Sequence, residues 1–557
     1  MAKKIVGATL GHCVHVAGVL NFLRLAEACG YQTTFLGVGC SDQELIGALR
    51  EEDPEYLAVS YRLTPGVAKK LFASLKNSLQ EAGLLHKKLL FGGTPPVAAE
   101  ARASGLFTLV FSGEEEETEI IAFLKGLHGH GTADGDSAGR KKREPGQTLL
   151  ERIQEKAPYP LLRHHFGLPS LEETIAGVDR LATAGVLDVI SLGPDQNAQE
   201  SFFRPEEMDP AQDGAGGVPL RREEDLAALY RASRRGNFPL LRCYSGTRDL
   251  IRWGELTART IKNAWGAVPL FWYNRLDGRS NRPLQEAIAE NQQAMAWYAA
   301  QGIPVEVNEA HHWSLRGAPD SVAVAAFYLA AYNAKKAGVR DYVAQLMLNT
   351  PPGTSGAMDL GKCLAKIALI ERLAGPDFRI HRQIRAGLAS LSVKPAVAKG
   401  QLAASTLMGL ALKPEIIHVV AFCEADHAAT PDEIIESCGI VQGVLKNSIF
   451  DAPDLAADPA VQARRDKLIG EAELLLETIQ ALARPESDDS LTNPVILQEA
   501  VRIGLLDAPQ LKGNPEAAGR VRTGIINGAC RALSADGRRV LSEEERLQQA
   551  VNGRLHG

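Results

Sequence analysis

Short apolar segments alternate with longer amphipathic segments along most of this chain. In the first 125 residues, each apolar run is followed by a segment whose apolar residues recur at helical spacing. Predicted strands cover residues 4–10, 33–38, 56–64, 87–94 and 106–111, and predicted helices cover residues 19–29, 42–51 and 66–83. Five strands alternating with helices predict an α/β domain with a flavodoxin-like parallel sheet over residues 1–125.

The same alternation returns from about residue 165. Predicted strands cover residues 186–192, 239–245, 268–273, 304–308, 342–348, 379–385 and 416–422. Predicted helices lie between them, at residues 223–234, 250–263, 283–300, 321–337 and 358–374. Seven or more such units predict a TIM-type (β/α)8 barrel, which we assign to residues 149–454, with its active site in the loops that follow the strands.

Two further regions lack this alternation. Residues 126–148 are rich in glycine, small polar residues and charges, and they predict a flexible linker because they have almost nothing to bury. His128 and His130 offer a metal site as an alternative, but no fixed scaffold surrounds them. Residues 455–557 are mostly helical and charged in pattern, and we expect a helical C-terminal subdomain that covers the barrel mouth or makes an oligomer contact.

Composition narrows the class of protein. The chain has 557 residues, which is enough for two or three domains with large cores. Its formal net charge of −6 argues against a nucleic-acid partner, which usually meets a basic surface. No apolar run reaches the ~18–20 residues of a membrane span, and the N-terminus has no apolar signal segment. We therefore expect a cytoplasmic protein without a membrane partner.

The eight cysteines are scattered, and none forms a C-x-x-C pair or a zinc-finger spacing. Reduced cytoplasmic thiols are the default for such a pattern. The sequence also lacks C-x-x-x-C-x-x-C, the three-thiolate set that holds the iron–sulfur cluster of radical S-adenosylmethionine enzymes. We therefore exclude that class.

The loop after the first predicted strand carries the chemistry around which the chain is organised. Residues 11–18 read GHCVHVAG, between the strand and an amphipathic helix. This order places an imidazole at the carboxyl edge of a parallel sheet, where ligands bind in doubly wound folds. The spacing Cys13-x-His15-x-x-Gly18 resembles the D-x-H-x-x-G signature of cobalamin-binding domains. The resemblance implies that His15 is the axial ligand of the cobalt.

Two further elements occur in the order that this family has. Ser60 and Leu63 follow one buried strand, and Gly92 and Gly93 end the next. The resemblance implies that they line a deep slot for the nucleotide tail of cobalamin, because glycines let the backbone approach a ligand and a hydroxyl can hydrogen-bond it. The family's aspartate is replaced by Cys13, whose thiol is a weaker hydrogen-bond partner for the axial histidine.

A cobalamin domain followed by a barrel leaves two main classes of enzyme. Methyl-transferring corrinoid proteins usually place a helical bundle before the cobalamin domain, and the absence of such a cap here favours a mutase. Residues 240–440 resemble the catalytic subunit of glutamate (methylaspartate) mutase. The resemblance implies an adenosylcobalamin-dependent radical isomerase, a carbon-skeleton mutase, acting on a small carboxylate-bearing substrate. A methylcobalamin-dependent methyltransferase and a non-catalytic cobalamin-binding protein are the alternatives.

The resemblance also suggests catalytic residues. Glu309 stands where the family's strand-end glutamate contacts the substrate amine, although an exposed loop glutamate is the structural alternative. Asn308 replaces the family's arginine, which puts glutamate as the substrate in doubt. His311, His312 and His427 are candidates for acid–base chemistry near neutral pH. A metal site at Glu309 and the two adjacent histidines is disfavoured, since neighbouring side chains on a strand point to opposite faces.

Substrate carboxylates in such mutases are held by several arginines, because the planar guanidinium pairs bidentately with a carboxylate. The candidates at predicted strand ends are Arg242, Arg248, Arg275 and Arg279. Tyr273 is a candidate for stacking on the cofactor or the substrate, with packing inside the barrel as the alternative. A homodimer is the default assembly.

Overall fold

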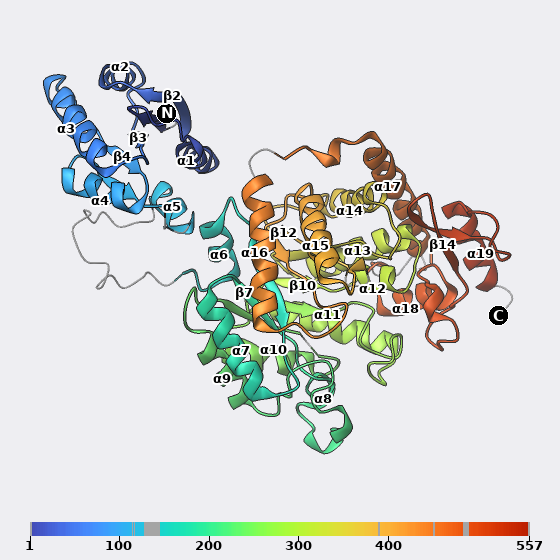
Figure 1. Ribbon diagram of the computed structural model, residues 1–557. Helices are drawn as coiled ribbons and strands as arrows, with labels where there is room; N and C mark the ends of the chain where they lie inside the picture. Colours follow the sequence, from blue (N-terminus) through green and yellow to red (C-terminus); the bar gives the residue numbers. More distant parts are fainter. Residues whose placement is uncertain are drawn as a thin grey trace. The chain divides into compact units, whose positions relative to one another are not determined.

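The chain forms two compact units, Met1–Arg143 and Glu144–Gly557. The structure is a computed structural model, and it describes residues 3–113, 115, 117–126, 145–244, 246–387, 390–448, 452–482 and 489–554. Most of the predicted linker, with His128 and His130, lies outside these residues. Figure 1 shows the elements of both units.

The first unit is built on a five-stranded sheet in the order β2-β1-β3-β4-β5, with every pair of neighbours parallel. Its strands are β1 (Lys4–Leu10), β2 (Gln32–Cys40), β3 (Tyr56–Ser60), β4 (Leu89–Gly92) and β5 (Leu109–Phe111). Its helices are α1 (Ala17–Ala28), α2 (Asp42–Glu52), α3 (Pro65–Glu81), α4 (Pro95–Ser104) and α5 (Glu117–Leu124). The predicted flavodoxin-like fold is confirmed.

Local sequence explains where these elements begin and end. Ser41 and Glu44 form a capping box that starts α2, since each side chain satisfies a backbone N–H of the other. The strand predicted over residues 56–64 ends at Ser60, and α3 then begins with a proline, which suits the first turn of a helix. Because β1, β3 and β4 are neighbours, the three segments that follow them lie along one edge of the sheet.

The second unit contains eight parallel strands in the order β8-β7-β6-β13-β12-β11-β10-β9. They are β6 (Leu161–Phe166), β7 (Val189–Leu192), β8 (Leu240–Cys243), β9 (Gly266–Val268), β10 (Val305–Val307), β11 (Asp341–Leu348), β12 (Arg379–Ala386) and β13 (Ile416–His418). The N–H of Ala264, just before β9, donates to the carbonyl of Leu241 in β8 at 2.9 Å. The sheet therefore curls back on itself, and the predicted (β/α)8 barrel is confirmed.

Helix α6 precedes the first barrel strand, and the other helices of the barrel follow strands (Figure 1). They are α6 (Leu149–Lys156), α7 (Leu171–Ala184), α8 (Gln196–Ser201), α9 (Glu223–Ser233), α10 (Leu250–Ile261), α11 (Leu284–Ala300), α12 (Ala310–Leu315), α13 (Asp320–Lys336), α14 (Gly356–Glu371), α15 (Pro395–Leu410) and α16 (Pro431–Ser448). The predicted helices among these agree with the structure to within three residues at each end.

The first barrel strand, β6, was absent from the predicted strands. Its sequence, LLRHHF, carries three consecutive polar residues that interrupt an apolar run. Inside the barrel, Arg163 donates to Gln383 Oε1 at 2.7 Å, to Ser191 Oγ at 2.7 Å and to Gln345 Oε1 at 3.0 Å. Burial of a polar group costs free energy unless the group is hydrogen-bonded. The polar residues of β6 are therefore stable inside the barrel only with hydrogen-bond partners on other strands.

The last part of the second unit is mostly helical, as expected, and it also contains two strands. It contains α17 (Pro459–Gln480), α18 (Pro494–Ile503) and α19 (Glu543–Arg554), together with an antiparallel hairpin of β14 (Arg522–Ile526) and β15 (Ala529–Leu533). Helix α17 packs on α13 and α14. Asn514 donates to the carbonyls of Arg275 and Leu276 at 3.1 and 2.9 Å, so this region supports the loop after β9.

Within the described ranges, no helix has the length and apolar character that crossing a membrane requires. The cysteines are free thiols, seven of them buried.

Candidate cobalamin site and active site

The loop between β1 and α1 is held by hydrogen bonds to its own strand and to β2. The N–H of Cys13 donates to the carbonyl of Leu10 at 3.1 Å. Thr9 Oγ1 donates to the carbonyl of Cys13 and accepts from the N–H of Gly39, the latter at 2.9 Å. These bonds bury Cys13 and leave His15 exposed at the carboxyl edge of the sheet.

Cys13 and His15 are in contact through their side chains. The sulfur of Cys13 lies 3.8 Å from Nδ1 of His15. In metal proteins the second ring nitrogen of a histidine ligand usually meets a carboxylate, a carbonyl or water, which orients the ring. Here a thiol takes that place, so Nε2 of His15 is the nitrogen that can face a metal.

The residues after β3 and β4 fit a ligand that enters the edge of the sheet. Ser60 Oγ is buried and has no hydrogen-bond partner among the described residues. A Cβ on Gly92 would meet nothing within 4 Å, whereas one on Gly93 would lie 2.6 Å from the carbonyl oxygen of Tyr61. Gly18 also borders open space, and the side chain of Leu63 is 44% exposed. An orphaned hydroxyl beside the open face of Gly92 suits the tail of a cobalamin.

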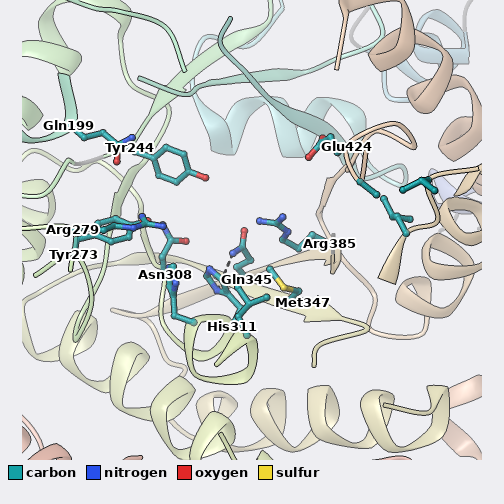
Figure 2. Close-up of a pocket in the computed structure, with 15 residues that line it drawn as sticks. Gln199, Tyr244, Tyr273, Arg279, Asn308, His311, Gln345, Met347, Arg385 and Glu424 are labelled. Carbon is teal, nitrogen blue, oxygen red and sulfur yellow. Dashed lines mark hydrogen bonds between the residues drawn. The ribbon is translucent and has the colours of Figure 1, made fainter. Parts of the chain in front are cut away.

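A cavity of about 680 Å³ lies at the carboxyl ends of the barrel strands. Its lining comes from segments that follow or end seven of the eight strands (Figure 2). The lining residues are Gln199, Tyr244, Tyr273, Arg279, Asn308, His311, His312, Leu315, Gln345, Met347, Arg385, Leu391, Val393, Glu424 and Ala425. This size and mixture are those of a site for a small molecule.

His311 and His312 both reach this cavity, because they lie in the short helix α12 and not on a strand. Their ring centroids are 4.4 Å apart. Burial, together with nearby positive groups, holds the pKa of both imidazoles well below the usual value. Both rings are therefore neutral at pH 7, and each offers one N–H donor and one acceptor.

A third histidine lies beneath the cavity. Nε2 of His165 is 2.6 Å from the hydroxyl of Tyr244, and the two rings stack with centroids 4.8 Å apart. Burial and the adjacent Arg163 and Arg242 hold the pKa of His165 well below its usual value. A neutral His165 can accept the proton of the Tyr244 hydroxyl in a hydrogen bond.

The four predicted substrate arginines are dispersed, and only Arg279 lines the cavity. Arg242 is fully buried below it, 3.2 Å from Glu306. Arg248 donates to the carbonyl of Glu200 at 2.7 Å and pairs with Glu207, whereas Arg275 is 3.8 Å from Glu516. A position at the end of a predicted strand does not show whether an arginine lines the cavity or lies below it or outside it, because its location depends on the curvature of the closed barrel.

A second arginine, Arg385, lines the cavity, and it was not among the predicted substrate arginines. It lies on β12, and its position at the end of a predicted strand was the available signal. Figure 2 shows Arg279 beside Tyr273 on one side of the cavity and Arg385 on the other. The guanidinium of Arg279 lies 4.5 Å from the centre of the Tyr273 ring. Glu424 also lines the cavity, 2.8 Å from Nε2 of His164.

The two other predicted catalytic residues lie outside the lining. Glu309 is 1% exposed and accepts from the N–H groups of Leu270 and Phe271 and from Nε1 of Trp313, at 2.7–3.1 Å. Burial raises the pKa of Glu309 to about 8 despite these bonds. His427 is half exposed, between Asp426 and Glu433. Glu309 thus holds the loop that leads to Tyr273, and His427 belongs to a separate cluster.

Comparison with known proteins identifies the first unit. Residues 3–122 match the model of the B12 binding domain. The glutamate mutase sigma subunit 2 of Haloarcula marismortui is 30% identical over 136 residues, which make up 23% of this chain and 89% of that subunit. The predicted resemblance to cobalamin-binding domains is confirmed.

Two solved structures are also similar. A cobalamin-binding protein from Desulfitobacterium hafniense DCB-2 is 25% identical, over 20% of this chain and 52% of that protein, with a TM-score of 0.18. The cobalamin-dependent S-adenosylmethionine radical enzyme OxsB with aqua-cobalamin is 11% identical over all of this chain and 80% of its own, with a TM-score of 0.19. Through its N-terminal unit, this chain belongs to the family of B12-binding domains.

Proposed function

We propose that this protein is an adenosylcobalamin-dependent radical isomerase that rearranges a small carboxylate-bearing substrate. The observation that carries the proposal is the cavity at the barrel mouth, lined by Arg279 and Arg385, in a chain that begins with a B12-binding domain. The similarity of that domain to a glutamate mutase subunit supports the same class of reaction.

The cofactor, when bound, supplies an organic radical by cleavage of its cobalt–carbon bond, and the protein supplies binding, orientation and seclusion. His15 is the proposed ligand of the cobalt, with Cys13 behind its ring. Ser60, Gly92 and Gly93 would receive the nucleotide tail. Within the barrel, Leu315, Met347, Leu391 and Val393 give the cavity an apolar part.

The charged groups of the cavity define the substrate class. Arg279 and Arg385 are fixed cations, and a guanidinium forms two parallel hydrogen bonds with a carboxylate. Glu424 adds one negative group. Burial alone would raise its pKa, but His164, the N–H of Ala421 and the charge of Arg385 together lower the pKa below the usual value. In place of Glu309, Glu424 is therefore the carboxylate that can meet a positive group of the substrate.

The remaining polar lining is uncharged. Asn308, Gln345 and the neutral His311 and His312 can donate to, or accept from, the substrate without taking its proton. Gln345 Nε2 lies 3.4 Å from Nδ1 of His311, which orients that ring. A cavity with two fixed cations and neutral hydrogen-bonding groups positions an anionic substrate while leaving the bond rearrangement to the radical.

The test is anaerobic reconstitution of the full chain with adenosylcobalamin, followed by electron paramagnetic resonance as amino and hydroxy acids are added. We expect a paramagnetic signal that depends on one carboxylic acid. His15→Ala should abolish that signal, whereas His12→Ala, which removes an exposed histidine three residues earlier in the same loop, should preserve it.

Three results would contradict the proposal. Silence with every acid, together with loss of the methyl group of methylcobalamin to a thiol or folate acceptor, would indicate a methyltransferase. Tight binding of both cofactor forms without either reaction would indicate a cobalamin carrier. A chain that binds neither form would show that the first unit does not hold cobalamin.

A further inference from the structure

A cluster of potential metal ligands lies in the loop between β13 and α16, outside the lining of the cavity. Cys423, His427 and Glu433 each place one ligand atom within 4.8 Å of the ligand atoms of the other two. The cluster combines a sulfur, an imidazole nitrogen and a carboxylate oxygen. From these residues we propose a binding site for a divalent transition metal, with Zn²⁺ as the ion that such a ligand set favours.

The backbone of the loop brings the first two ligands together. The N–H groups of Asp426 and His427 both donate to the carbonyl of Cys423, at 2.8 and 3.0 Å. This single helical turn places side chains four positions apart on the same side of the chain. The sulfur of Cys423 and the ring of His427 therefore face the same space.

Glu433 is fixed at the start of α16. Its Oε2 accepts from the N–H and the hydroxyl of Thr430, at 2.9 and 2.8 Å, which forms one half of a capping box. The second oxygen, Oε1, is then directed to Nε2 of His427 at 2.9 Å. One carboxylate oxygen thus holds the helix, and the other contacts the His427 nitrogen, so a metal bound between these two atoms would replace that contact.

The surroundings of His427 have the arrangement of a metal-bound histidine. Its Nδ1 lies 3.0 Å from Oδ2 of Asp426, opposite the nitrogen that faces Glu433. A carboxylate behind the ring fixes the tautomer that presents the other nitrogen to a metal. In the described part of the chain, His427 is the ion-pair partner of both Asp426 and Glu433, and neither carboxylate pairs with a lysine or arginine.

Burial and exposure differ across the cluster in a way that suits an open metal site. Cys423 is 5% exposed, so its sulfur lies on the buried side of the cluster. The side chain of His427 is 50% exposed. Three protein ligands and one side toward solvent leave a fourth tetrahedral position for water or another ligand.

The site adjoins the cavity through the chain itself. Glu424 and Ala425, which line the cavity, lie between Cys423 and His427 in the sequence. A metal held by Cys423 and His427 would fix both ends of this segment. It would thereby position the Glu424 carboxylate, which Figure 2 shows turned into the cavity on the side of Arg385.

The experiment uses the full chain, stripped with a chelator and kept free of cobalamin so that the metal can be measured separately from the proposed isomerase activity. Zn²⁺ is titrated by calorimetry, and Co²⁺ is added as an optical probe of thiolate ligation. We expect one Zn²⁺ per chain and a cobalt–thiolate absorption band. Cys423→Ser and His427→Gln should each weaken Zn²⁺ binding more than Asp426→Asn, whose effect we expect to be about tenfold.

Two matched variants control for the loss of a thiol and of an imidazole. Cys438→Ala removes a buried cysteine of α16, and His86→Gln removes an exposed histidine of the first unit. Both should bind Zn²⁺ as the unaltered chain does. Absence of Zn²⁺ binding, unchanged affinity in Cys423→Ser, or a cobalt spectrum without the thiolate band would each overturn the proposal. His427→Gln alters an exposed side chain, so its result does not depend on a change in the buried core.

Discussion

The hydroxyl of Tyr244 and Nε2 of His165 lie 2.6 Å apart, and they connect the lining of the cavity to the interior of the barrel. The guanidinium of Arg242 lies 4.8 Å from the centre of the Tyr244 ring, and it also forms an ion pair with Glu306. A neutral His165 accepts the hydrogen bond of the Tyr244 hydroxyl. This bond fixes the orientation of the O–H group, because its proton points to Nε2 of His165. The free lone pair of the Tyr244 oxygen is then presented to a ligand in the cavity.

Replacement of Tyr244 by phenylalanine should slow turnover of the proposed substrate with little effect on cobalamin binding. Loss of one neutral hydrogen bond to the substrate costs about 0.5–1.5 kcal/mol, so we expect kcat to fall about 2–13-fold. The measurement is steady-state kinetics, with cobalamin affinity determined separately. Tyr328→Phe, on the outer helix α13, is the control and should retain full activity. A Tyr244→Phe variant with unaltered kcat would exclude a role for the hydroxyl.

Replacement of Arg385 by glutamine should weaken substrate binding. Loss of a charge-assisted hydrogen bond costs about 1.5–3 kcal/mol, which predicts a KM about 10–100-fold higher. Arg248→Gln is a matched control, because Arg248 is bonded to Glu200 and Glu207 outside the cavity lining. The measurement is the KM of each variant, determined by steady-state kinetics. A higher KM in Arg248→Gln, with Arg385→Gln unchanged, would mean that the substrate binds elsewhere.

Replacement of Cys13 by aspartate should strengthen cobalamin binding. A carboxylate behind His15 accepts a stronger hydrogen bond from Nδ1 than a thiol does, and it makes Nε2 a better ligand. Changes of this kind alter metal affinity about 10–100-fold, so we expect at least a tenfold gain in a folded variant. Spectrophotometric titration with cobalamin measures it. Cys29→Ala, at a half-buried cysteine of the same unit, should leave the affinity unchanged.

A folded Cys13→Asp variant that bound cobalamin no better than the unaltered chain would show that the thiol does not limit the ligand strength of His15.

Replacement of Glu309 by glutamine should change how the stability of the barrel depends on pH. Burial raises the pKa of Glu309 from 4.5 to about 8, so the folded state binds this proton more tightly than the unfolded state. Its stabilising contribution is complete below pH 4.5 and is lost as pH rises towards 8, at up to ~1.4 kcal/mol per pH unit. Glutamine cannot titrate, so the variant lacks this slope.

The glutamine variant should also be less stable at pH 5.5, by about 1–3 kcal/mol, because its amide N–H groups face the indole N–H of Trp313. The difference should narrow as pH approaches 8. Urea unfolding followed by tryptophan fluorescence reports on this unit alone, since all five tryptophans lie in it. Glu477→Gln, at an exposed position of α17, is the control. A gap between Glu309→Gln and the unaltered chain that stays constant with pH would contradict the assigned pKa.

Local sequence was sufficient where the chemistry depends on neighbours in the chain. Cys13 and His15 lie in one loop, and Gly92 and Gly93 end one strand, so their spacing predicted the cobalamin site directly. The barrel was predicted in the same way from the repeated alternation of strand and helix. The exception was β6, whose polar residues Arg163 and His165 are stable only with partners on distant strands.

The sequence by itself therefore determined the two folds and the loop proposed to bind cobalamin, because hydrophobic periodicity and turn residues act over a few positions. Only the tertiary structure decided which polar residues share a cavity. Closure of the barrel brings together Tyr244, Asn308, Arg385 and Glu424, which lie on or after four different strands. It also buries Arg242 while leaving Arg275 half exposed. Those outcomes depend on the curvature and register of the whole sheet, which no single segment of sequence encodes.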